Sequence, residues 1–277
     1  MGILDGKKVK FEILEELKKK VELLDRKPGL AVIQIGEDPA SCVYVKNKNK
    51  MADNLGYIFN HIKLSEDVNE EEVLSIISNL NNDDNIDGIL VQMPVPKHLN
   101  PKVIQEAIDP FKDVDGLNSV NMGKLAHDTN CLIPCTPMGI VDLLKYYNIP
   151  ISGKNVTIIG RSDLVGKPLA SLMTNNNATV TLCHSKTSNL KDFTLLADIL
   201  VVAVGVPNLI TKDYVKEGSV VIDVGINRLD NGKICGDVDF DSVKDKVSYI
   251  TPVPGGVGQM TVAELGLNTY KAYILRK

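Results

Sequence analysis

Apolar positions in the first half of the chain alternate between helical and strand-like spacing. Residues 13, 14, 17, 21 and 24 are apolar and share one helical face, which Pro28-Gly29 ends. Residues 30–35 and 86–91 are short apolar runs that predict buried strands. Between them, the pattern predicts a helix from Pro39 to about residue 55 with Gly56 as its stop, a strand over residues 57–64 and a helix around residues 73–80.

The second half begins a new series of the same kind. The pattern predicts strands over residues 154–159, 178–183, 199–204 and 220–224, a helix over residues 166–174, and a hairpin at Asn231-Gly232. After the Pro- and Gly-rich stretch 109–137, Thr136 is predicted to cap a helix, and the spacing of Thr261 and Glu264 predicts a last helix over residues 261–277.

Strands separated by helices of this length are typical of βαβ units. We therefore expect an α/β protein with two α/β domains, the second a Rossmann-like parallel sheet. The first domain is predicted over residues 1–135 and the second over residues 136–260.

Composition narrows the classes of function. Hydrophobic residues make up 44% of the 277 residues and charged residues 24%, as in globular proteins. The net charge of −4, without a basic stripe, argues against a nucleic-acid partner. No apolar run approaches a membrane span, and residues 1–10 lack the core of a signal peptide. The five cysteines lack a disulfide-like spacing, and Cys131 and Cys135 have no second ligand pair, so we expect a cytoplasmic protein with reduced thiols and no metal.

One turn of the second half has features of a dinucleotide site. The strand ending at residue 159 runs into Gly160-Arg161-Ser162, and Gly166 opens a helix six residues after Gly160. Such a turn lets the backbone approach a phosphate, although many strand–helix turns carry glycine for steric reasons alone. The next strand ends in residues 184–187, His-Ser-Lys-Thr, without the carboxylate typical of NAD sites, which favours NADP.

Two later strand ends carry glycine as well, at Gly205 and Gly225. The carboxyl ends of strands are where ligands bind in open α/β sheets. Ile226 could therefore pack against a nicotinamide, or these residues could simply form tight turns that leave the sheet.

Candidate residues for acid–base chemistry lie in the first half. Ser41, Tyr44 and Lys48 share one face of the second predicted helix, and a lysine in an apolar cleft can act as an acid or base. On spacing alone, an ordinary solvated face is the better interpretation, because Lys46, Lys48 and Lys50 lie close together. Gln92 ends a buried strand and could bind a nearby lysine, while Asp113 and Asp115 could be catalytic or could only form a turn.

Taken together, these segments resemble one family over essentially the whole chain. The sequence is similar to the bifunctional methylenetetrahydrofolate dehydrogenase/methenyltetrahydrofolate cyclohydrolases. The motifs that carry the resemblance are Ser41–Lys48, Val91–Pro96, Lys112–Gly116, Pro134–Pro137, Gly160–Ser162 with Val165–Pro168, and Pro252–Thr261. The chain departs from the family at Gln259, where proline is usual, and at Met93 and Val95.

The resemblance implies an activity and a role for each matched residue. It implies a homodimer that oxidises 5,10-methylenetetrahydrofolate with NADP and hydrolyses the product to 10-formyltetrahydrofolate, in a cleft between two domains. It also implies that the last helix, residues 261–277, returns to the first domain and completes it. The implied catalytic residues are Lys48, Tyr44, Gln92 and Asp115, which would also bind the folate together with Pro254 and Gly255. The implied NADP contacts are Gly160, Arg161, Ser162, Ser185 and Ile226.

Three alternatives stay open at this point. The chain could be a dehydrogenase that lacks the hydrolytic activity, since the cofactor motifs do not separate the two. It could be another two-domain NADP dehydrogenase, such as the shikimate type, or a non-catalytic NADP-binding module. The intact set of Tyr44, Lys48, Gln92 and Asp115 favours the bifunctional enzyme.

Overall fold

The computed structural model describes residues 1–229 and 231–277, and the chain divides into two compact units. The six-stranded unit comprises Met1–Phe11 and Thr136–Thr261, and the three-stranded unit comprises Glu12–Cys135 and Val262–Lys277. Residues 1–11 therefore group with the second half of the chain, whereas the sequence pattern assigned them to the first domain.

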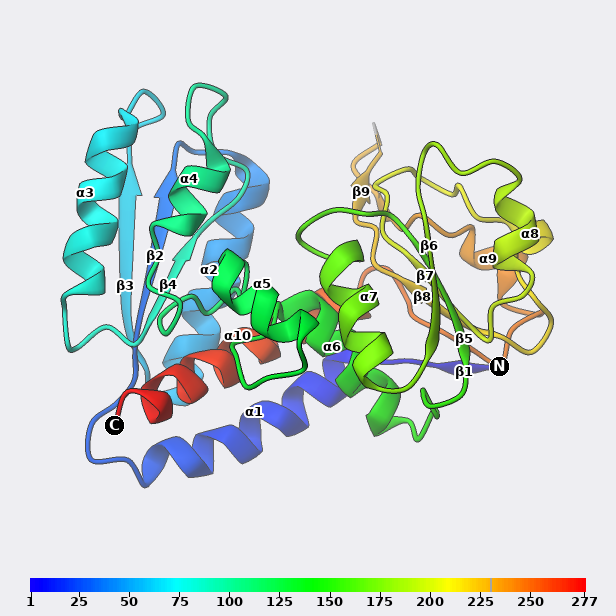
Figure 1. Ribbon diagram of the computed structural model, residues 1–277, viewed down its shortest axis with the longest axis horizontal. Coiled ribbons are helices and arrows are strands. Elements are labelled where there is room, and N and C mark those ends of the chain that lie inside the picture. Colours follow the sequence, from blue (N-terminus) through cyan, green and yellow to red (C-terminus); the bar gives the residue numbers. More distant parts are fainter. Residues whose placement is uncertain (230) are drawn as a thin grey trace. The chain divides into compact units, whose positions relative to one another are not determined.

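The sheet of the three-stranded unit is parallel and has the order β3-β2-β4 (Figure 1). Its strands are β2 (Gly29–Ile35), β3 (Ile58–Leu64) and β4 (Gly88–Val91), as the apolar runs predicted. The helices α2 (Pro39–Leu55) and α3 (Glu70–Asn81) were also predicted. Two short helices, α4 (Pro101–Glu106) and α5 (Ser119–Ala126), were not.

Local chemistry explains why α2 has these bounds. Asp38 accepts a hydrogen bond from the backbone N–H of Ser41 and so caps the helix, and Pro39 has the backbone angle that a first turn requires. Gly56 ends the helix in the left-handed conformation, at φ +73°. The helix therefore places Tyr44 and Lys48 in its middle, where the backbone is fixed by neighbouring turns.

Side chains of β2 alternate between two cores because successive residues of a strand point to opposite faces. On one face, Leu30 and Val32 pack with buried residues of α2 and of the first and last long helices. On the other face, Ala31 and Ile33 pack with buried residues of α3 and α4. The sheet is thus covered on both sides, which accounts for its continuous apolar sequence.

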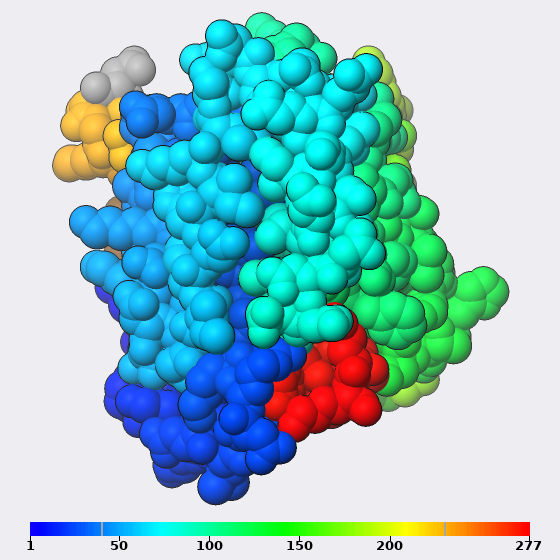
Figure 2. All heavy atoms as spheres, turned by 90° about the vertical axis from the view of Figure 1, so that its left-hand side faces the viewer, coloured from blue at the N-terminus to red at the C-terminus, as the bar shows by residue number. Residues whose placement is uncertain are grey.

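The last helix, α10, spans Val257–Leu275 and begins four residues before the predicted start at Thr261. The prediction was wrong because the Thr261 hydroxyl donates to the Val257 carbonyl one turn earlier, inside the helix. Near the C-terminus, Arg276 donates to the carbonyl of Ile86 and pairs with Asp87. In the space-filling view, the red C-terminal residues accordingly lie against blue and cyan residues of the same unit (Figure 2).

The six-stranded unit contains a wholly parallel sheet of order β1-β11-β8-β7-β5-β6. The four strands predicted from the pattern form its larger part, which confirms the Rossmann-like parallel sheet. The pairing of β1 with β11 explains why residues 1–11 belong to this unit. The strands are β1 (Gly2–Ile3), β5 (Asn155–Ile159), β6 (Thr179–Cys183), β7 (Ile199–Val202), β8 (Val220–Asp223) and β11 (Tyr249–Ile250).

The strands of this unit are connected by a hairpin and several helices. The predicted hairpin at Asn231-Gly232 is present as an antiparallel pair. The helix α6 begins at Cys135, so Thr136 lies inside it rather than at its cap, and the Thr136 hydroxyl bonds that of Thr261 at 2.9 Å. The remaining elements are α1 (Gly6–Glu22), α6 (Cys135–Tyr146), α7 (Gly166–Asn175), α8 (Leu190–Thr194), η1 (Lys212–Tyr214), β9 (Asn227–Arg228), β10 (Ile234–Cys235) and α9 (Phe240–Val243).

Candidate active site

A hydrogen-bonded pair of the half-buried Lys48 and the buried Gln92 forms the centre of the candidate site in the three-stranded unit. Lys48 Nζ donates to Gln92 Oε1 at 2.8 Å. Gln92 Nε2 in turn donates to the Met93 carbonyl at 2.6 Å, and a carbonyl only accepts, so the amide oxygen must face Lys48. Helix α2 supplies the lysine, and the residue directly after β4 supplies the glutamine. The solvated-face interpretation of Lys48 is therefore wrong.

Of the two acidic residues in the Lys112–Gly116 turn, Asp115 acts on Lys48 and Asp113 holds the turn. Asp113 is fully buried and accepts hydrogen bonds from the side chains of Gln105 and Asn121 and from the backbone of Asn118. Asp115 is partly exposed, and its carboxylate interacts electrostatically with Lys48. The sequence left both roles open, and the contacts separate them.

Burial and charge oppose each other at this site. Burial lowers the pKa of Lys48 below that of an ordinary lysine, and the Asp115 carboxylate partly counters that change. Burial likewise raises the pKa of Asp115, and Lys48 counters it. A lysine with a lowered pKa carries a larger fraction of neutral amine near pH 7, which is the form that accepts a proton.

Tyr44 lies one helical turn before Lys48 on α2 and is 39% exposed. Burial of the rest of its ring raises the pKa of its phenol, so the hydroxyl keeps its proton at neutral pH and can donate. Spacing in the sequence predicted this neighbourhood correctly, because residues four apart on a helix share a face.

Two residues near Lys48 received no role from the sequence. The buried Cys135 thiol donates to the Val114 carbonyl at 3.2 Å and interacts electrostatically with both Lys48 and Asp115. Asn268 of α10 donates to the same Val114 carbonyl at 2.9 Å and so fixes the residue before Asp115. Cys135 belongs to a motif that the sequence did single out, whereas no local signal marks Asn268.

The predicted dinucleotide turn lies at the carboxyl edge of the six-stranded sheet, between β5 and α7. Gly160 has φ +118°, and a Cβ there would lie 2.2 Å from the Ala203 carbonyl oxygen. A Cβ on Gly166 would lie 1.9 Å from the Gly160 carbonyl oxygen. The two glycines therefore touch each other, which explains their spacing. In the first turn of α7, Lys167 N–H donates to the Ser162 carbonyl at 3.1 Å and Pro168 has no N–H, so the turn offers a ligand at most the N–H of Gly166.

The other predicted cofactor contacts lie in this turn or follow other strands of the same sheet. Arg161, Ser162 and Ser185 are exposed, and Ile226 is 49% exposed just beyond β8. His184 accepts the backbone N–H of Lys186 on its ring nitrogen, which makes it part of the turn after β6. The polar residues that follow β6 carry no carboxylate.

The predicted folate loop precedes α10 in the six-stranded unit. Pro254 is exposed, and Gly255 has φ +116°. Gln259, the departure from the family pattern, accepts a hydrogen bond from Lys10 Nζ at 3.1 Å and lies in the first turn of α10. The loop and the Lys48 group belong to different compact units.

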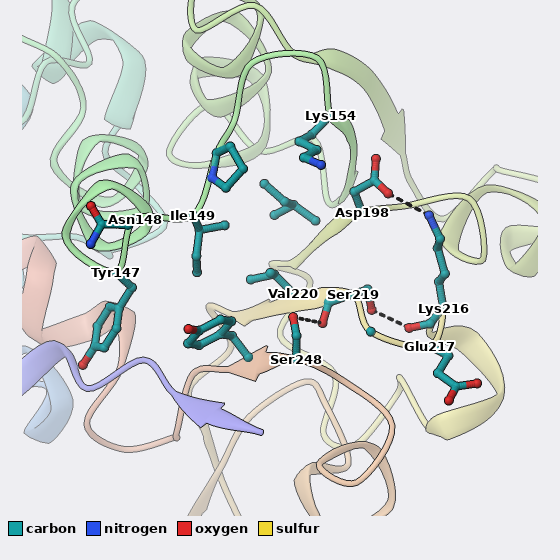
Figure 3. Close-up of a pocket in the computed structure, with 14 residues that line it drawn as sticks. Tyr147, Asn148, Ile149, Lys154, Asp198, Lys216, Glu217, Ser219, Val220 and Ser248 are labelled. Atoms are coloured by element: carbon teal, nitrogen blue, oxygen red, sulfur yellow. Dashed lines mark hydrogen bonds and ion pairs between the residues drawn. The ribbon is translucent and has the colours of Figure 1, made fainter.

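A pocket of about 340 Å³ lies at the opposite, amino-terminal edge of the same six-stranded sheet (Figure 3). Its polar groups bond one another: Asp198 pairs with Lys216 at 2.7 Å, and the Ser248 hydroxyl donates to the Ser219 carbonyl at 3.1 Å. Because amino ends of parallel strands lie at one edge and carboxyl ends at the other, this pocket is separate from the dinucleotide turn.

Two absences hold for the part of the chain that the structure describes. No three His, Cys, Asp or Glu side chains there gather as ligands for a metal ion. No helix within residues 1–229 and 231–277 is long and apolar enough to span a membrane.

Comparison with known proteins matches both halves of the chain. Residues 4–115 match the catalytic domain of the tetrahydrofolate dehydrogenase/cyclohydrolase family, and residues 134–277 match its NAD(P)-binding domain. The bifunctional protein FolD of Bacillus anthracis is 53% identical over 98% of this chain and 96% of its own length.

Solved structures agree with these matches. The FolD methylenetetrahydrofolate dehydrogenase/cyclohydrolase of Campylobacter jejuni is 47% identical, covers both chains fully and gives a TM-score of 0.98. The Trypanosoma brucei enzyme, complexed with NADP and an inhibitor, is 36% identical over 99% of this chain and 97% of its own, with a TM-score of 0.95.

The shikimate dehydrogenases share only the fold with this chain. The enzyme from Aquifex aeolicus is 13% identical, with a TM-score of 0.55. The motifs that the sequence singled out agree instead with the two folate-family domains, which together cover most of the chain. The chain therefore belongs to the tetrahydrofolate dehydrogenase/cyclohydrolase family.

Proposed function

We propose that the protein oxidises 5,10-methylenetetrahydrofolate to 5,10-methenyltetrahydrofolate with NADP⁺ and then hydrolyses the product to 10-formyltetrahydrofolate. The observation that carries this proposal is the Lys48–Gln92 hydrogen bond of 2.8 Å beside the Asp115 carboxylate. It supplies a half-buried amine with a lowered pKa, which the hydrolytic step requires and a simple hydride transfer does not.

In the hydrolytic step, water adds to the carbon of the amidinium cation, and one carbon–nitrogen bond then breaks. The neutral Lys48 amine accepts one proton from the attacking water and delivers it to the departing folate nitrogen, and the second water proton is released to solvent as the formyl C=O forms. Gln92 holds the amine in position through its amide oxygen. Tyr44 lies one turn earlier on the same helical face, where its protonated hydroxyl serves as a hydrogen-bond donor. Asp115 anchors the polar edge of the pterin ring and limits the fall in the pKa of Lys48.

The residues of the strand-end turn fit NADP. Gly160 and Gly166 leave the backbone open to a pyrophosphate, and the positive dipole end of α7 with the N–H of Gly166 faces the same turn. Arg161, Ser162 and Ser185 supply a cation and hydroxyls for a 2′-phosphate, and Ile226 supplies an apolar contact for the nicotinamide. When bound, the oxidised nicotinamide supplies the acceptor for the hydride of the folate methylene group.

The remaining assignments rest on the family. Residues 12–135 with the C-terminal helix form the folate-binding, catalytic part, and residues 136–260 form the NADP-binding part. Pro254 and Gly255 line the folate site. The protein acts in the cytoplasm as a homodimer.

The experiment mixes the purified protein with methylenetetrahydrofolate and NADP⁺ and records NADPH absorbance. The methenyl product is then supplied on its own, and the decay of its absorbance reports hydrolysis. The proposal expects both activities. Hydrolysis without NADPH formation, or neither activity, would contradict it.

A dehydrogenase without hydrolytic activity is the alternative that the same experiment addresses. It predicts NADPH formation with accumulation of the methenyl compound. The lowered pKa of Lys48 and its bond to Gln92 favour the bifunctional enzyme over this alternative.

A further inference from the structure

Two buried carboxylates lie beneath the strand ends of the candidate dinucleotide site. Asp223 is the last residue of β8, and Asp237 follows β10; they are 3% and 0% exposed. Among the described residues, neither has a lysine, arginine or histidine as an ion-pair partner. Burying an anion without a cation is unfavourable unless several donors satisfy it.

The donors to Asp237 come from two strand-end turns. Its Oδ2 accepts the backbone N–H groups of Val204 at 2.7 Å and Gly205 at 2.9 Å, just beyond β7. Its Oδ1 accepts the side-chain amide of Asn227 at 2.8 Å, the residue directly after Ile226. One carboxylate thus ties together the turns that follow β7 and β8.

The bond to Val204 also fixes a group that faces the glycine turn. The N–H and C=O of a trans peptide point in opposite directions, so the Ala203 carbonyl points away from Asp237. That carbonyl oxygen lies 2.2 Å from where a Cβ on Gly160 would be. Asp237 therefore sets the position of the peptide against which Gly160 packs.

Asp223 holds the other side of the same arrangement. Its Oδ1 accepts the N–H of Gly225 at 3.0 Å and of Asp237 at 2.9 Å, and its Oδ2 accepts that of Val238 at 2.9 Å. It therefore fixes both the turn before Ile226 and the segment that carries Asp237. Side chains are excluded nearby, since a Cβ on Gly225 would lie 2.2 Å from the Asp237 carboxylate.

We propose that Asp223 and Asp237 are positioning residues for the dinucleotide, which hold the turns 203–205 and 224–227 in the conformation that receives it. Neither carboxylate is proposed to touch the cofactor. The two act by fixing the backbone against which Gly160 packs and the turn that carries Ile226. Six N–H donors converge on the two buried carboxylates, so the side chains at these two positions must present oxygen atoms that accept hydrogen bonds. The inference rests on the proposed NADP-dependent function and deepens it.

Replacement of Asp237 by asparagine tests the pair with almost no change in shape. If the new amide oxygen faces Val204 and Gly205, its NH₂ group faces Asn227, which must turn its own amide over to accept; in the other orientation, the NH₂ group opposes the N–H groups of Val204 and Gly205. In both cases the negative charge that strengthens these hydrogen bonds is lost, so the turns are held less tightly. The matched control is Asp198→Asn, an aspartate at the opposite edge of the same sheet that accepts the N–H of Asn155 at 3.0 Å and pairs with Lys216.

The measurements are the dissociation constant for NADP⁺, both Michaelis constants of the dehydrogenase reaction, and hydrolysis of the methenyl compound, which uses no dinucleotide. For Asp237→Asn, we expect the NADP⁺ constants to rise about tenfold or more. The Michaelis constant for methylenetetrahydrofolate and the hydrolytic rate should stay within about twofold, a split that a general loss of structure would not give. Asp198→Asn should leave all of these unchanged.

Unchanged NADP⁺ binding in a folded Asp237→Asn protein would overturn the positioning role, and so would equal effects in the control. If Asp237→Asn loses the fold, Asn227→Ala decides instead, because it removes one donor and leaves the carboxylates in place. It should weaken NADP⁺ binding severalfold with hydrolysis intact, and unchanged binding would overturn the proposal. A wild-type protein that binds NADP⁺ but oxidises nothing would refute the proposed function while the ratio of dissociation constants still tests the pair.

Discussion

Replacement of Gly160 by alanine tests the structural logic of the dinucleotide turn. The residue has φ +118°, a region that L side chains rarely adopt, and strain of this kind costs about 1–3 kcal/mol. The new Cβ would lie 2.2 Å from the Ala203 carbonyl oxygen, which is backbone and cannot rotate away. Overpacking of this sort costs about 1–3 kcal/mol. The sum, about 2–6 kcal/mol, is a large part of a typical net stability of about 5–15 kcal/mol.

Gly218→Ala is the matched control in the same unit. Gly218 has φ +74°, but a Cβ added there would meet nothing within 4 Å, so only the backbone strain of about 1–2 kcal/mol remains. The assay is urea unfolding followed by far-ultraviolet circular dichroism, together with the dissociation constant for NADP⁺. We expect the unfolding midpoint to fall clearly further for Gly160→Ala than for Gly218→Ala, and NADP⁺ binding to weaken only for Gly160→Ala. Equal midpoints and equal binding in the two variants would refute the argument.

Two further predictions concern titrating groups. Asp115→Asn removes the carboxylate that raises the pKa of Lys48, so the acidic limb of the pH profile of hydrolysis should move to lower pH; an unmoved limb would contradict the electrostatic coupling. Burial raises the pKa of Asp113 to about 6, so the folded state binds its proton more tightly than the unfolded state does between about pH 4 and 6. Relative to Asp113→Asn, the free energy of unfolding of the wild type should therefore fall by up to about 3 kcal/mol as pH rises through this window, and parallel stability curves would refute it.

Much of the fold could be predicted because local signals agree with the tertiary structure. Helix α2 has its predicted bounds, because the ring of Pro39 fixes the backbone of the first turn and Gly56, which lacks a side chain, adopts the left-handed conformation that ends the helix. The Thr261 signal failed because a capping-box spacing can also occur inside a helix, where the threonine hydroxyl bonds the preceding turn. Helices α4 and α5 were missed because each is less than nine residues long and too short for a periodic apolar face.

The candidate site was predicted in part from residues and in part only from resemblance. Spacing on α2 related Tyr44 to Lys48, and the strand end placed Gln92 at the correct edge of the sheet. The contact between Lys48 and Gln92 joins residues 44 positions apart, and no periodicity reports such a distance. Asp113 and Asp115 differ in role because only Asp113 accepts hydrogen bonds from the surrounding Asn118 and Asn121. These donors are brought to Asp113 by the fold, so the sequence alone could not separate the two residues.

The measurement that tests the central claim most directly is the pair of activities of Lys48→Met. The methionine side chain is unbranched and similar in length to that of lysine, but it is apolar and cannot transfer a proton. Hydrolysis of the methenyl compound should fall by about 10²–10⁴-fold, the usual contribution of general acid–base catalysis. NADP⁺ binding should be unchanged, because the dinucleotide turn belongs to the other compact unit. Hydrolysis at the wild-type rate would remove the amine of Lys48 from the mechanism.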